Sequence, residues 1–197
     1  MKPNTLFLKP RNPNLKKKNM NSSTICSLFL GLILISQSPF AANARVLGLG
    51  GGGGRGPLVS LLCAASSNKV ECNKVLSSPQ ITQAKNYKQL SKAVIEMALK
   101  KAVEGQAFLK GLAQKNPKLE TCAGFAYDGV VGSFKSCLGE ITEDPQTASY
   151  DCGVVGDGPT QCDRIMADAH IVNPAITALN KQILFLSSLA SRAVDKL

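Results

Sequence analysis

Apolar residues recur at intervals of three and four along most of the chain after residue 56, which is the periodicity of one face of an α-helix. Long segments with this pattern cover about residues 82–115, 118–142, 146–170 and 174–197. No stretch alternates apolar and polar residues for long enough to predict a strand. The last segment is the most regular, with apolar residues at Ile176, Leu179, Ile183, Leu186, Ala190, Ala193 and Leu197. The pattern predicts an all-α protein.

Prolines separate the long segments. Asn-Pro pairs lie at 116–117 and 173–174, and Glu-Asp-Pro occupies 143–145. The residue before a proline avoids the α-helical region, so each of these positions should interrupt a helix. Gly-Asp-Gly-Pro at 156–159 lies inside the third segment and should kink or split it. Short connections favour antiparallel neighbours, and we therefore expect an up-down-up-down four-helix bundle.

Two shorter helical segments precede the bundle, at about residues 57–63 and 69–76. Pro57 suits the first position of a helix, and Leu58, Leu61 and Leu62 give the first segment an apolar stripe. Ser-Ser-Pro at 77–79 should end the second segment. The sequence therefore predicts an N-terminal helical hairpin followed by the bundle, together forming one domain over residues 57–197.

Residues 1–44 have the features of a secretory signal peptide. Three lysines at 16–18 precede an apolar run at 25–35, and Ala42-Asn43-Ala44 offers a small-x-small cleavage site. The apolar run is much shorter than the ~20 residues that cross a bilayer, which argues against a membrane anchor. Met20 is an alternative start. We expect cleavage after Ala44 and export of the chain.

Residues 45–56 are nearly all glycine from position 48 onward. They satisfy the G-x-G-x-x-G pattern only trivially, because no strand precedes them and no Gly-Lys-Ser/Thr follows. We interpret this stretch as a linker between the leader and the domain.

The formal net charge of +10 is concentrated in the leader. Residues 1–44 carry six of the 23 Lys and Arg residues and no acid, so the rest of the chain holds 17 bases against 13 acids. A net charge of +4 on the remaining chain is ordinary for a soluble surface. No nucleic-acid-binding face is indicated.

The cysteines predict disulfides. Cys26 would be removed with the leader. The cysteines that remain are even in number, as expected for disulfides in an oxidising compartment. They are Cys63, Cys72, Cys122, Cys137, Cys152 and Cys162. Spacing alone does not choose among the possible pairings. A zinc site would need closely paired cysteines or several histidines, and the chain has one His. We therefore expect no metal and no cofactor.

Several short features, taken together, resemble the plant invertase/pectin methylesterase inhibitor family over about residues 57–197. They are the Cys63-x8-Cys72 spacing, with Ser66 where the family usually has Thr; Cys122-Ala123 with Tyr127 five residues on; Thr-Gln-Cys-Asp-Arg-Ile at 160–165; and Leu-Ser-Ser-Leu-Ala at 186–190. The resemblance rests on the order and spacing of these features, on the helical content and on the leader.

The resemblance implies Cys63–Cys72 and Cys122–Cys162 disulfides, and a hairpin followed by a four-helix bundle. The sequence departs from the family at Lys69, where many members have a proline, and at two cysteines outside the usual frame. Cys137 and Cys152 flank the 143–145 turn, and residues seven or eight positions either side of a turn face each other in an antiparallel hairpin. A third bridge between them is therefore our own inference.

Family members block a carbohydrate-active enzyme, in a 1:1 complex, by docking over its active-site cleft. The targets are pectin methylesterases or acid invertases, in the apoplast and cell wall or in the vacuole. Invertase-directed members use a Pro-Lys-Phe element at the start of the third bundle helix. The matching residues here are Pro145, Gln146 and Thr147, in a spacing that leans to the invertase type. Without the Lys and Phe, the charge and the aromatic anchor of that element are missing.

Three other functions compete with enzyme inhibition. A hydrolase would need a histidine held beside a nucleophile, and His170 is the only candidate, which we interpret as a helix-end residue. A small helical lipid-binding protein would need a cavity, and the adjacent Cys-Cys and Cys-x-Cys pairs usual in such carriers do not occur. A relative that kept the fold, lost inhibition and serves signalling or binding is the remaining alternative.

Overall fold

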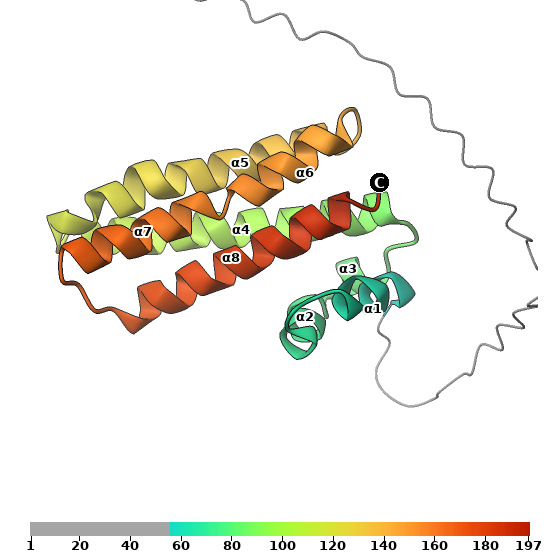
Figure 1. Ribbon diagram of the computed structural model, residues 1–197, viewed down its shortest axis with the longest axis horizontal. Helices are drawn as coiled ribbons and strands as arrows, with labels where there is room; N and C mark the ends of the chain where they lie inside the picture. The colour runs from blue at the N-terminus through green and yellow to red at the C-terminus, as the bar shows by residue number, and fades with distance from the viewer. Residues whose placement is uncertain (1–55) are drawn as a thin grey trace, which may run out of the picture. The chain divides into compact units, whose positions relative to one another are not determined.

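The computed structural model describes residues 56–197, so the predicted signal peptide and residues 45–55 of the predicted linker lie outside the described residues. The described part consists of helices joined by short connections (Figure 1). In chain order they are α1 (Pro57–Ala64), α2 (Lys69–Val75), α3 (Pro79–Thr82), α4 (Tyr87–Ala113), the 3₁₀ turn η1 (Pro117–Leu119), the π-helical turn η2 (Cys122–Ala126), α5 (Tyr127–Glu140), α6 (Pro145–Val154), α7 (Asp157–Asp168) and α8 (Pro174–Val194).

The long helices form an up-down-up-down four-helix bundle, with α6 and α7 following one another as its third member (Figure 1). α4 packs against α5 and α8, and α6 packs against α5 and α8, so each member has two antiparallel neighbours. α1 and α2 pack together as the N-terminal hairpin, and α1 and α3 contact the bundle. The predicted fold class, a disulfide-stapled four-helix bundle with an N-terminal hairpin, is confirmed.

Asn or Asp caps mark where helices begin. The side chains of Asn86, Asp144 and Asn173 accept hydrogen bonds from free backbone N–H groups at the starts of α4, α6 and α8. In α6 and α8 a proline follows the cap, where its missing N–H costs nothing. Asn68 caps α2 in the same way, with the Glu71 N–H at 3.0 Å.

Three details differ from the sequence prediction. Pro79 ends the second short helix, as expected, but also begins α3, so that the first long helix starts at Tyr87 rather than near residue 82. The second long segment begins with η1 and η2 before α5. A π-helical turn holds an extra residue and shifts which side chains face the core, and Cys122, Ala123 and Ala126 are all buried here.

The predicted break in the third segment lies between α6 and α7. Gly158, in the first turn of α7, lies against η2 and α5. A Cβ atom at this position would be 2.4 Å from Cγ2 of Val130 and 2.5 Å from the carbonyl oxygen of Ala126. The absence of a side chain therefore lets α7 approach these elements closely, a packing role that explains a glycine inside a helix.

A buried polar chain joins three bundle members. The Tyr127 hydroxyl donates to Oδ1 of Asn180 at 2.7 Å, and Nδ2 of Asn180 donates to Oδ1 of Asp163 at 2.6 Å. Tyr127 and Asn180 are both fully buried. Burial, followed by the charge of Asp163, raises the pKa of the Tyr127 phenol. This series of hydrogen bonds fixes the relative positions of α5, α7 and α8, because each buried polar atom has its partner.

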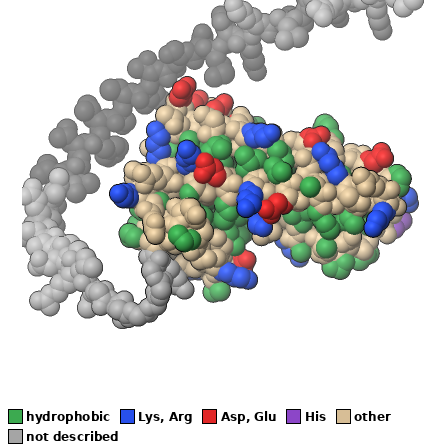
Figure 2. All heavy atoms as spheres, turned by 180° about the vertical axis from the view of Figure 1, so that it is seen from behind, with side chains coloured by type: hydrophobic (Ala, Val, Ile, Leu, Met, Phe, Trp, Pro, Cys, Tyr) green, Lys and Arg blue, Asp and Glu red, His purple; other side chains and the backbone are tan. Residues whose placement is uncertain are grey.

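None of the helices within residues 56–197 is long and apolar enough to span a membrane. Lys and Arg side chains lie interspersed with Asp and Glu over the face of the molecule in Figure 2.

Candidate partner-binding site

Three disulfides link neighbouring helices. Cys63–Cys72 joins α1 to α2, Cys122–Cys162 joins η2 to α7, and Cys137–Cys152 joins α5 to α6. All six cysteines are buried. These are the pairs named from the sequence, including the third pair beside the α5–α6 turn. The Cys137–Cys152 bond lies two turns from the start of α6 and ties that helix to α5.

The start of α6 holds the residues expected to contact a partner. Pro145 is half-buried as the first residue of the helix, and Gln146 is exposed beside it. Thr147 is turned back onto the cap: its N–H donates to Oδ1 of Asp144 at 3.0 Å and its hydroxyl to Oδ2 at 2.7 Å. The structure therefore leaves Gln146 free to meet a partner and engages Thr147 within the helix end.

The Asp144 carboxylate is the charged group of this helix start. The backbone N–H of Thr147, and after it the Thr147 hydroxyl, lower the pKa of the Asp144 carboxyl below its ordinary value. The carboxylate also lies at the helix N-terminus, where a negative charge is favourable. A negative charge thus persists next to Gln146 in mildly acidic solution.

A shallow hollow of about 300 Å³ lies beside these residues, between α6 and the end of α8. We call the exposed and half-buried residues that line it the α6-start surface: Pro145, Gln146, Ser149, Tyr150, Asp195 and Leu197. The Ser149 hydroxyl is hydrogen-bonded to the Ser191 hydroxyl at 3.1 Å and donates to the Asp195 carboxylate. These contacts hold the two helices together below the hollow.

Tyr150 is the exposed aromatic residue of this surface, and the sequence reasoning missed it. Its side chain is 68% exposed, four residues after Gln146 and therefore on the same side of α6. The signal in the sequence is its position, because the apolar stripe of this segment runs through Ala148, Cys152 and Val155 and leaves Tyr150 outside it. Exposed tyrosines are common anchors in protein interfaces.

His170 has the surroundings of a helix-ending residue. It adopts a positive φ of 54° immediately after Ala169, the C-cap residue of α7. Its N–H donates to the Ala167 carbonyl at 3.1 Å, and the Ile171 N–H donates to the Met166 carbonyl at 2.8 Å. This pair of bonds is the Schellman arrangement. No group of three or more His, Cys, Asp and Glu that could hold a metal ion occurs within residues 56–197.

Comparisons with known proteins place the fold. No protein-family model matches the sequence, and no curated protein matches it either. Among solved structures, a pectin methylesterase inhibitor from Arabidopsis thaliana matches with a TM-score of 0.53 and 17% identity, covering 71% of this chain and 95% of that one. The chain has the pectin methylesterase inhibitor fold. Mutant form A of a pectin methylesterase inhibitor from Arabidopsis matches with a TM-score of 0.54 and 19% identity, over 71% of this chain and 96% of that one.

The likeness to the pectin methylesterase inhibitor fold covers nearly the whole of each matched inhibitor. At these identities it establishes how the helices are arranged and leaves open which side chains meet a partner. The choice of the α6-start surface as the candidate contact is therefore based on the exposure and geometry of its own residues.

Proposed function

We propose that this protein is an inhibitor, not an enzyme, and that it docks over the active-site cleft of a plant pectin methylesterase in a 1:1 complex. The observation that carries the proposal is the fold, because the solved structures that match it are named as inhibitors of that enzyme. The packed bundle, with its histidine at a helix end, supports inhibition over catalysis.

The α6-start surface is the proposed point of contact. It offers an exposed aromatic side chain, Tyr150, next to the free amide of Gln146 and above a hollow. Tyrosine combines a large apolar area with a hydroxyl group, and such residues often carry most of an interface's binding energy. Contacts below it between Ser149, Ser191 and Asp195 pre-organise the surface, which limits the entropy lost on docking.

Acid invertase is the second candidate target. The spacing between the α5–α6 turn and Cys162 resembles that of invertase-directed members of the family. The side chains favour pectin methylesterase, because Gln146 carries no positive charge and Thr147 is engaged with Asp144. Neither residue offers what the invertase-directed element uses to approach catalytic carboxylates.

We further propose that the protein acts in the cell wall and apoplast, with the vacuole as the alternative. The predicted signal peptide supports export, and disulfides form and persist in such oxidising compartments.

The proposal is tested by titrating the protein, produced as the full chain through a secretory pathway with its disulfides formed, against a pectin methylesterase and a cell-wall invertase. Residual activity of the esterase should fall linearly and reach its minimum near one equivalent of inhibitor. A stronger effect on the invertase would transfer the proposal to that target. If neither enzyme loses activity, the non-inhibitory fold relative becomes the better description.

A matched pair of variants tests the contact surface. Tyr150→Ala should weaken inhibition by about tenfold or more, as expected when an interface anchor is removed. Phe125→Ala is the control, because Phe125 is 72% exposed, similar to Tyr150, but lies in η2, away from the α6-start surface. Equal losses in both variants would mean that the α6-start surface is not the contact.

A further inference from the structure

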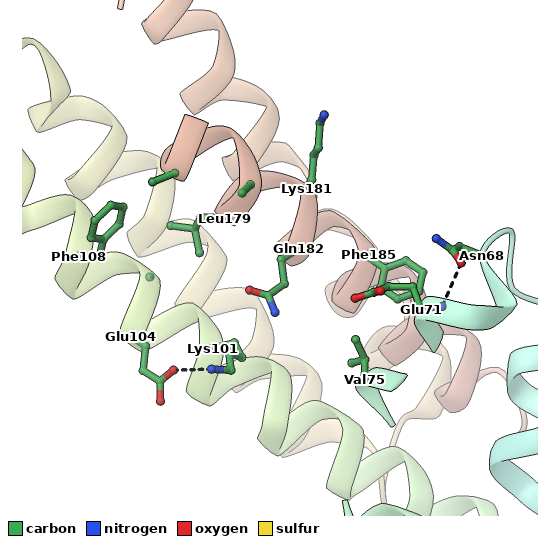
Figure 3. A pocket seen from close by; sticks show the side chains of 13 residues that line it. Asn68, Glu71, Val75, Lys101, Glu104, Phe108, Leu179, Lys181, Gln182 and Phe185 are labelled. Carbon is green, nitrogen blue, oxygen red and sulfur yellow. Dashed lines mark hydrogen bonds and ion pairs between the residues drawn. The ribbon is translucent and has the colours of Figure 1, made fainter. Parts of the chain in front are cut away.

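A groove of about 870 Å³ lies between α2 and the seam where α4 meets α8 (Figure 3). It shares no residue with the α6-start surface. Its apolar walls come from three helices: Val75 on α2, Phe108 on α4, and Leu179 and Phe185 on α8. The volume falls within the ~300–1,000 Å³ of sites that take small molecules, and aromatic and aliphatic walls are typical of them.

The floor of the groove is tightly packed. A Cβ atom on Gly105 of α4 would lie 2.7 Å from Cδ1 of Leu179 on α8, so the absence of a side chain lets these two helices approach closely. The opposite wall stands apart, because α2 packs mainly against α1, while α1 and α3 make the hairpin's contacts with the bundle. The groove therefore lies between α2 on one side and the packed α4–α8 pair on the other.

The charges around the groove balance. Lys101 and Lys181 contribute two positive charges, and Glu71 and Glu104 two negative ones. Lys101 and Glu104 form an ion pair at 2.9 Å, and that hydrogen bond lowers the pKa of the Glu104 carboxyl. Lys181 extends away from the groove in Figure 3. The side chains that line the groove therefore carry no net charge, and a charged ligand would gain no net attraction from them.

One polar side chain sits between the two phenylalanines. The amide of Gln182 points from α8 toward α4 in Figure 3 and can both donate and accept hydrogen bonds. Asn68, at the end of the groove beside α2, already uses its Oδ1 to cap that helix. The groove thus offers apolar contact along its length and one free amide that suits a hydroxyl group.

We propose that this groove binds an uncharged amphiphile, a small molecule with an apolar or aromatic body and hydroxyl groups, as a function separate from enzyme inhibition. The apolar body lies against Val75, Phe108 and Phe185, and a hydroxyl group pairs with Gln182. The neutral ligand leaves the Lys101–Glu104 ion pair intact.

The groove is tested with N-phenyl-1-naphthylamine, an uncharged probe that becomes fluorescent in apolar surroundings. The full chain, produced by secretion with its disulfides formed, is titrated beside two variants with the same substitution. Ala178→Phe places a ring in the groove and should weaken binding by about tenfold. Ala107→Phe is the control, because Ala107 is exposed on α4 outside the groove and its substitution should leave binding unchanged.

Competition defines the ligand class. Octyl glucoside, which is uncharged and carries hydroxyl groups, should displace the probe at lower concentration than octanoate, which is anionic. Gln182→Leu should weaken the effect of octyl glucoside by about fivefold, the worth of one neutral hydrogen bond, while keeping the affinity for the probe. Loss of probe binding in this variant with unchanged helical circular dichroism would contradict the assigned role of Gln182.

Three outcomes would overturn the proposal. One is equal probe binding by the Ala178→Phe and Ala107→Phe variants, which would place the probe elsewhere. Another is stronger competition by octanoate than by octyl glucoside, which would mean that the groove prefers anionic ligands. The third is a dimer, detected by light scattering, that dissociates in the Ala178→Phe variant, because a second copy of the chain would then occupy the groove.

Discussion

The N-terminal hairpin and the four-helix bundle use the same kind of cross-link in different surroundings. The hairpin and α3 add only a few buried side chains to the common core, Val59, Leu62, Leu76 and Ile81 beside Cys63–Cys72, and the hairpin leaves Leu61 and Val70 exposed at 62% and 81%. In the bundle, the other disulfides lie within a continuous core that runs along every long helix. The disulfide therefore compensates for the small number of buried side chains in the hairpin, whereas in the bundle it reinforces an extensive core.

The largest expected effect tests the bundle half of this comparison. Replacing Cys122 and Cys162 with alanine removes a cross-link that closes a loop of 40 residues, worth roughly 4 kcal/mol by chain entropy. The whole bundle should lose stability cooperatively, because η2 and α7 lie in its core. Urea unfolding followed by circular dichroism measures the loss.

The Cys137→Ala/Cys152→Ala variant is the matched comparison, since the disulfide it removes closes a loop of only 15 residues within the same core and its loss should cost about 3 kcal/mol. A smaller loss for the Cys122/Cys162 variant than for this one would show that loop length does not govern the bundle disulfides.

The next effect separates the hairpin from the bundle. Replacing Cys63 and Cys72 with alanine should cost roughly 2.5 kcal/mol by loop closure, and the cost should fall on the hairpin alone. Hydrogen exchange should then show that amides of α1 and α2 lose protection while those of α4 and α8 keep theirs. Uniform loss of protection across both parts would mean that the hairpin and the bundle unfold as one unit.

A smaller effect concerns the polar chain inside the bundle. Tyr127→Phe removes the donor to Oδ1 of Asn180 and leaves that buried oxygen without its partner, at a cost of about 1–3 kcal/mol. Tyr150→Phe is the control, because Tyr150 is exposed and makes no such bond. Equal stability of the two variants would contradict a structural role for the buried bond.

The burial of the Tyr127 phenol, with the charge of Asp163 beside it, also predicts a pH dependence. The pKa of the Tyr127 phenol is raised in the folded protein, so its contribution to stability is complete below the ordinary tyrosine value of about 10 and is lost as the pH rises above it. Phenolate absorbance during alkaline titration should therefore show one ionisation that coincides with loss of helical circular dichroism. This step should be missing in Tyr127→Phe and present in Tyr150→Phe.

The sequence predicted the bundle well because two independent local signals agree. The apolar periodicity marks the helices, and the proline pairs at 116–117, 144–145 and 173–174 mark their ends. At Pro79 the same logic predicted the end of one helix but missed the start of α3, because a proline that stops one helix can also occupy the first position of the next. The π-helical turn at Cys122–Ala126 escaped because it changes the register by one residue within an otherwise helical pattern.

The two proposed binding surfaces were less accessible to sequence reasoning. Pro145, Gln146 and Thr147 were found by family resemblance, but the hydrogen bonds that engage Thr147 depend on the cap geometry of Asp144. The exposure of Tyr150 could have been predicted from the sequence, since this residue lies outside the apolar stripe of its helix. The groove had none, because it depends on where the hairpin packs against α4 and α8, and no local pattern specifies that distance.

The smallest expected effect on the fold is also the sharpest test of target choice. Gln146→Lys with Thr147→Phe restores the charge and the aromatic ring of the invertase-directed element at the exposed start of α6. Because Asp144 still accepts the N–H of residue 147, the helix should keep its start, and the melting temperature should change little. Inhibition of a cell-wall invertase should strengthen, because the lysine can approach the enzyme's carboxylates. The matched variant Gln146→Lys alone should give part of the gain. No gain in either variant would mean that this turn does not correspond to the invertase-directed element.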